Sequence, residues 1–168
     1  MKGEYWILCD LIRGPEDGTA HVLEQLFHIA PLYEPGAAEP LRAGKVLAAP
    51  DEVVTCDAGR SNLAILPAGA EGLEARTEKG RTVPAVGWFG VLGEWPTWDV
   101  TLQTESALPA RLDAVLYPLR PGADIHEHPS VTRLRADGQV TALRVQGCGL
   151  DDTFILCEEG AGDRKSVV

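Results

Sequence analysis

Residues 5–31 read YWILCDLIRGPEDGTAHVLEQLFHIAP, and this stretch decides the fold class. In its first part, apolar residues occupy both alternating faces. The return part alternates again, with His21 on one face and His28 on the other. A period of two is typical of β-strands, and the turn formers of RGPEDG separate the two runs. We therefore expect two long strands folded back on each other. A helix over HVLEQLFHIA is the competing interpretation, because three of its apolar residues also share a helical face.

The rest of the chain repeats this pattern in shorter pieces. Apolar runs recur at a spacing of roughly 8–12 residues, separated by turns drawn from 18 Gly and 12 Pro. Asp137-Gly138, between the runs 131–135 and 140–145, is the clearest hairpin signal. The pattern predicts an all-β, antiparallel β-sandwich of about a dozen short strands. We expect a single domain over residues 1–160, followed by a frayed tail at 161–168.

The charge and the apolar content of the chain exclude some classes of binding partner. The net charge of −10 comes without any cluster of Lys or Arg, which argues against nucleic acid and against simple attraction to a polyanion. No apolar run approaches the roughly 20 residues of a membrane span. The chain begins Met1-Lys2-Gly3-Glu4 and leads directly into a strand without a cleavage site. We therefore expect no signal peptide, and the abrupt start suggests a fragment of a longer protein.

The four cysteines, Cys9, Cys56, Cys148 and Cys157, have no C-x-x-C spacing, so a zinc ribbon is not expected. Three of them lie in strand-like runs, where a small buried residue is the simplest interpretation. A disulfide is the alternative that the sequence leaves open.

An ordered set of segments resembles a known family. YWILCDLI, HVLEQLFHIAP, NLAILP, GWFGVLGE and LPARLDAVLYPLRPG together resemble the C-terminal part of heparinase II/III-like polysaccharide lyases. In that family a strand ends in an Asp, here Asp10. The return strand opens with a histidine, here His21, and ends in a pair such as Phe27-His28. The Gly-Trp step falls at Gly87-Trp88. The resemblance covers about residues 5–122.

The resemblance implies stacked antiparallel sheets that follow an N-terminal helical toroid. Members cleave polysaccharides containing uronic acid by β-elimination, with a tyrosine-type acid/base supplied mainly from upstream segments. None of those catalytic motifs occurs here. The resemblance thus implies a non-catalytic module, inactive alone and without a cofactor, that packs on the toroid and lines the polysaccharide groove. The sequence leaves the localisation of this chain open, and a secreted or periplasmic parent enzyme is one option.

Four residues are candidates for contact with that substrate. Trp88 and Trp95 are suited to stacking on sugar rings, although indoles also pack in cores. Trp95, beside a glycine and a proline, is expected to be the most exposed. His28, beside Phe27, is the histidine of this ribbon that we select for a role in the groove. His21, seven residues earlier, lies on the opposite strand face, so the two histidines are not expected to share a metal ion. Tyr33 is the tyrosine placed in a loop.

His126-Glu127-His128 is the one metal-like cluster. In a strand, His-x-His places both rings on one face, as in the metal sites of cupin-like barrels. Pro121, Gly122 and Pro129 instead suggest an exposed loop, and the sequence offers no third ligand at a telling distance. Two alternatives to the lyase module therefore stay open. One is a stand-alone carbohydrate-binding module that uses Trp stacking, and the other is a cupin-like metal-binding sandwich.

Overall fold

The computed structural model describes residues 5–32, 44–69, 72–90, 95–136 and 140–157. These residues form fifteen strands and no helix, which confirms the all-β, antiparallel prediction. They also contain no helix long and apolar enough to cross a membrane. The predicted tail at 161–168 lies outside the described residues.

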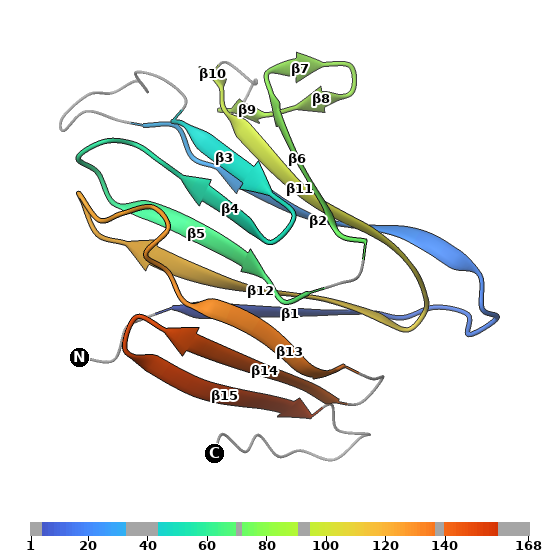
Figure 1. Cartoon of the computed structure of the whole chain (residues 1–168). Coiled ribbons are helices and arrows are strands. Elements are labelled where there is room, and N and C mark those ends of the chain that lie inside the picture. Colours follow the sequence, from blue (N-terminus) through green and yellow to red (C-terminus); the bar gives the residue numbers. More distant parts are fainter. Residues whose placement is uncertain (1–4, 33–43, 70–71, 91–94, 137–139, 158–168) are drawn as a thin grey trace.

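Three larger antiparallel sheets carry the fold (Figure 1). The central sheet has the order β1 (Trp6–Ile12), β12 (Ala110–Leu119), β5 (Asn62–Pro67), β4 (Glu52–Thr55), β3 (Val46–Ala49). A second sheet has the order β2 (Ala20–Ile29), β11 (Trp98–Ala107), β6 (Glu74–Lys79). The C-terminal sheet has the order β13 (Ser130–Ala136), β14 (Val140–Gly147), β15 (Leu150–Cys157). Two small ribbons pair β7 (Arg81–Thr82) with β8 (Ala85–Val86), and β9 (Trp88–Phe89) with β10 (Trp95–Pro96).

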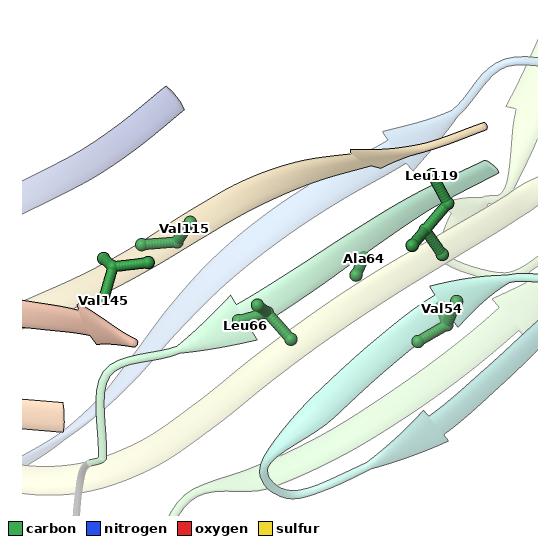
Figure 2. Packing of buried hydrophobic residues seen from close by; sticks show 6 residues of the cluster. All are labelled: Val54, Ala64, Leu66, Val115, Leu119 and Val145. Carbon is green, nitrogen blue, oxygen red and sulfur yellow. The ribbon is translucent and has the colours of Figure 1, made fainter. Parts of the chain in front are cut away.

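The central sheet is buried on both faces. Val54 and Leu66 belong to a core cluster that also contains Val145 of the C-terminal sheet (Figure 2). Their neighbours Val53 and Ile65 point the other way and pack with residues of β11 in the second sheet. Strands buried on both faces read as continuous apolar runs, which explains the sequence NLAILP in β5. The three sheets therefore stack as layers around two cores.

The opening ribbon is not a hairpin, which corrects the expectation for residues 5–31. β1 pairs with β12 in the central sheet, whereas β2 pairs with β11 in the second sheet. The β1–β2 and β11–β12 connections therefore both pass from one layer to the other, at matching positions. Apolar residues on both faces of β1 do not distinguish a hairpin from such a crossing. The helix alternative for HVLEQLFHIA is wrong, because β2 pairs with β11 along its full length.

The strand faces of β2 follow the predicted alternation. Leu23 and Gln25 are buried, while Val22, Leu26 and His28 face outward. His21 and His28 therefore lie on opposite faces, as expected. The hairpin signal at Asp137-Gly138 is confirmed by the pairing of β13 with β14, although residues 137–139 themselves lie outside the described residues.

The four cysteines are free. Cys9 and Cys56 are half-buried, but Cys148 and Cys157 are exposed, so the expectation of burial fails for Cys157. Burial, followed by the neighbouring Asp113, raises the pKa of the Cys9 thiol to about 12. Cys9 therefore stays protonated at neutral pH.

Candidate functional site

Two of the predicted substrate residues meet in one surface pocket. His28, from β2, and Trp88, from β9, both line an open cavity of about 560 Å³. The remaining lining comes from Asp99 and from residues in and beside the β7–β8 ribbon. We call this cavity the His28 pocket. Its lining residues are His28, Thr82, Ala85, Val86, Gly87, Trp88 and Asp99. The volume lies within the range of about 300–1,000 Å³ typical of small-molecule sites.

A histidine–carboxylate pair forms the polar part of this pocket. His28 and Asp99 stand directly opposite each other on β2 and β11. The His28 Nδ1 lies 2.9 Å from the Asp99 Oδ1, with the imidazole 43% exposed and the carboxylate 11% exposed. The carboxylate accepts the Nδ1–H and thereby fixes the ring. This contact leaves the Nε2 of His28 available to a hydroxyl group in the pocket.

Gly87 holds the other carboxylate oxygen. Its backbone N–H donates to the Asp99 Oδ2 at 2.9 Å. Its φ is +71°, and a Cβ there would lie 2.7 Å from the Thr97 carbonyl oxygen and 2.9 Å from the Gly80 nitrogen. Only glycine combines this dihedral with so close an approach. The close approach of the Gly87 backbone thus orients Asp99.

The tryptophans separate into different environments. Trp88 is half-buried, and its indole N–H donates to the Arg81 carbonyl at 2.8 Å, which fixes the ring at the pocket wall. Trp95 is also half-buried, is paired with Phe89, and is not among the residues that line the His28 pocket. It is less exposed than expected. Trp6, at 58%, is the exposed tryptophan, and it lies on the edge strand β1. Tyr33 lies outside the described residues.

The His126-Glu127-His128 segment does acquire a third partner. Glu52, at the start of β4, brings its carboxylate against both rings, and we call these three residues the Glu52 cluster. Its Oε2 lies 2.6 Å from the His128 Nε2, and its Oε1 lies 3.3 Å from the His126 Nδ1. One ligand atom from each residue lies within 4.8 Å of the others. His126 is 65% exposed, as a loop predicts, but His128 is only 14% exposed.

Asp99 and Glu52 are the residues that sequence reasoning missed. Asp99 stands in a strand whose alternation predicts an outward residue, and outward acids are usually solvated. Glu52 is 74 positions from His126, so only the tertiary fold joins them. A signal for Asp99 existed in the glycine of the Gly-Trp step, because a glycine in a strand edge often marks close approach to another group.

Neither of the two described tyrosines, Tyr5 and Tyr117, has a lowered pKa. Burial, and then the hydrogen bond that Tyr5 donates to the Asp152 carboxylate at 2.8 Å, raise the pKa of Tyr5. Burial also raises the pKa of Tyr117. Neither phenol is therefore suited to act as a base near neutral pH. No family model, curated protein or solved structure matches this chain.

Proposed function

We propose that this chain is the non-catalytic β-sandwich module of a heparinase II/III-like polysaccharide lyase, and that the His28 pocket contributes to the wall of the substrate groove. The single observation that carries the proposal is the meeting of His28, Trp88 and Asp99 in one cavity. An aromatic ring beside a fixed pair of hydrogen-bonding groups suits a sugar, which presents an apolar C–H face and a rim of hydroxyls.

Arg81 is the cation beside the pocket, because it directly precedes the pocket residue Thr82. It pairs with Glu78 at 2.5 Å, and Glu78 stands opposite Asp99 on β6 and β11. Lys79 stands opposite Trp98, on the other strand face from Asp99. Arg81 is therefore the group that would meet the carboxylate of a uronic-acid sugar at this site.

The outer face of β2 supports the expected contact with a helical toroid. Val22 is 62% exposed and Leu26 is 59% exposed, and both share this face with His28. Glu24 lies between Val22 and Leu26 on this face, and a mixed face with two large exposed apolar side chains fits an interface with another domain. A toroid seated on Val22 and Leu26 would leave the His28 pocket at the edge of the junction, where a groove between the two domains would run.

The test is titration of the chain with a uronic-acid oligosaccharide, followed by NMR or calorimetry, beside an assay for β-elimination. We expect weak binding that Trp88→Ala and His28→Ala each reduce, and no unsaturated product absorbing in the ultraviolet. Trp6→Ala is the matched control, because it removes an exposed indole outside the pocket. Product formed by the chain alone, or binding that neither pocket variant weakens, would contradict the proposal.

The same titration distinguishes the groove-wall proposal from a stand-alone carbohydrate-binding module. A carbohydrate-binding module that works by Trp stacking would bind strongly without any toroid, and neutral oligosaccharides would bind as well as acidic ones. A groove wall would bind weakly, because most of the contacts would come from the missing domain. It would also favour the acidic sugar over the neutral one.

A further inference from the structure

We infer that Glu52, His126 and His128 form a binding site for a divalent transition-metal ion, with zinc as the fitting representative. Two imidazoles and one carboxylate are a donor set that suits Zn²⁺ and its neighbours in the first transition row. The site is independent of the proposed carbohydrate function. It uses no residue of the His28 pocket.

The separations of the ligand atoms are close to those that a metal requires. Two atoms each about 2.0–2.1 Å from a tetrahedral zinc ion lie about 3.3 Å apart. The Glu52 Oε1 and His126 Nδ1 already stand at 3.3 Å. The Glu52 Oε2 and His128 Nε2 stand at 2.6 Å, and the ligand atoms of the three residues lie within 4.8 Å of one another, so the side chains would adjust around an entering ion.

The hydrogen bonding of His128 points to a cation at its Nε2. Its Nδ1 lies 3.2 Å from the Pro129 carbonyl oxygen, which can only accept a hydrogen bond. With Nδ1 engaged in this way, Nε2 faces the Glu52 carboxylate, where a proton or a metal ion would join the two groups. A metal ion between the two groups accepts a lone pair from each. A ring nitrogen that donates to a backbone carbonyl while the other binds metal is the usual arrangement of zinc-bound histidines.

The backbone that presents these ligands is ordered by its own hydrogen bonds. The His126 N–H donates to the Asp124 carboxylate at 3.0 Å, and the Glu127 N–H donates to the Asp124 carbonyl at 3.0 Å. Pro129 is completely buried and anchors His128 at the start of β13. Glu52 comes from β4 and the two histidines come from the connection between β12 and β13, so a bound ion would join the central sheet to the segment that leads into the C-terminal sheet.

Three protein ligands leave a coordination position for water or another small ligand. Glu52 and His128 also line a cavity of about 480 Å³. A zinc site with three protein ligands and an adjoining cavity has the composition of sites that bind an exchangeable ligand, whereas structural zinc sites are closed by four protein ligands. Small anions such as carboxylates are the ligand class that such an ion would take up.

Calorimetric titration of the intact chain with ZnCl₂ tests the inference, together with the visible spectrum of the Co²⁺ complex. We expect one equivalent to bind, with d–d bands of cobalt and no thiolate charge-transfer band, although exposed Cys148 and Cys157 are present. His128→Ala and Glu52→Gln should each weaken zinc at least 10–100-fold, since even the outer partners of metal ligands contribute that much.

His126→Ala keeps the test decisive if the other variants fold poorly, because a 65% exposed side chain removes no core contact. His28→Ala is the matched control and should bind zinc like the wild type. Absence of zinc binding by the wild type would overturn the inference. Unchanged affinity in His126→Ala, or a cobalt spectrum dominated by thiolate, would overturn it equally.

Discussion

The His28 pocket and the Glu52 cluster both contain a histidine against a carboxylate, but they use the carboxylate differently. In the pocket, one oxygen of Asp99 meets His28 and the other accepts the backbone N–H of Gly87. In the cluster, both oxygens of Glu52 meet histidine nitrogens. A carboxylate whose second oxygen is held by backbone orients one ring for hydrogen bonding. A carboxylate between two rings gathers three electron-pair donors around one point.

The contrast shows how a histidine–carboxylate pair can lead to different expected ligands, depending on which partner is exposed. Asp99 is the buried partner and His28 is exposed, so the imidazole is offered to a ligand in the pocket. In the cluster the imidazole of His128 is the more buried group, and the exposed ring of His126 closes the site from outside. We therefore expect a polar organic ligand at the first and an ion at the second.

The largest expected effect comes from the layer junction that carries the Glu52 cluster. Arg133 of β13 lies 2.9 Å from Asp113 of β12, whose side chain is wholly buried. Arg133→Ala would leave that carboxylate without its ion-pair partner, and the free energy of unfolding should fall by about 3–5 kcal/mol. Urea denaturation measures this loss. Arg76→Ala, which breaks the exposed pair with Glu74, should cost at most about 1 kcal/mol. Equal losses in both variants would contradict the interpretation.

Gly87→Ala should break the His28 pocket without touching the Glu52 cluster. The left-handed backbone alone costs about 1–2 kcal/mol for a residue with a Cβ. The clash with the Thr97 carbonyl adds to this and displaces the N–H that holds Asp99. Gly59→Ala is the matched control, since Gly59 has the same φ of +71° and open space around it. We expect a larger loss of stability in Gly87→Ala, with loss of oligosaccharide binding confined to that variant.

Replacing each of the two carboxylates by its amide should weaken the ligand of its own site and leave the affinity for the other ligand unchanged. Asp99→Asn removes the charge that strengthens the hydrogen bond to His28, so oligosaccharide affinity should fall by about 1 kcal/mol, or roughly fivefold. Its zinc affinity should equal that of the wild type. Glu52→Gln should do the reverse, weakening zinc alone. Calorimetry with each ligand measures all four affinities, and a variant that weakens both ligands would remove the distinction between the sites.

The last expected effect depends on pH and concerns Cys9, beside Asp113 at the same junction. Its thiol pKa is raised from 9.0 to about 12 in the folded chain, chiefly by burial. The unfolded chain therefore ionises first, and the contribution of Cys9 to stability should be complete below pH 9 and lost as the pH rises towards 12. Urea midpoints across this range should fall less in Cys9→Ala than in the wild type. Cys157→Ala, at an exposed position, should follow the wild type.

Local alternation was enough to predict the strands but not their partners. The segment NLAILP is strand β5, and the segment LPARLDAVLYPLRPG contains strand β12. The supposed hairpin of residues 5–31 failed because both ends of the β1–β2 connection continue as strands in different layers. Pairing depends on residues around a hundred positions away, such as Leu116 opposite Trp6. No periodicity within 27 residues contains that information.

The sequence predicted those site residues that are recognisable from their sequence neighbours, and it missed those that only the tertiary fold brings to the site. His28 and Trp88 were expected from their own surroundings, and the fold then supplied Asp99 between them. His126 and His128 were recognised as a pair of ligands, but Glu52 joins them only because β4 lies beside the segment before β13. Exposure was misjudged for Trp95, whose neighbours suggested a loop, whereas it pairs with Phe89 in a short ribbon.

The two sites can be compared in one measurement, because the chain has four histidines in all. Long-range ¹H–¹⁵N spectra of the imidazole rings, recorded as zinc and then a uronic-acid oligosaccharide are added, report on each ring separately. We predict that zinc shifts the signals of His126 and His128 and that the sugar shifts those of His28, with His21 unmoved by either. Zinc-induced shifts at His28, or a sugar that moves no imidazole signal, would contradict the assignment of separate ligands to the two sites.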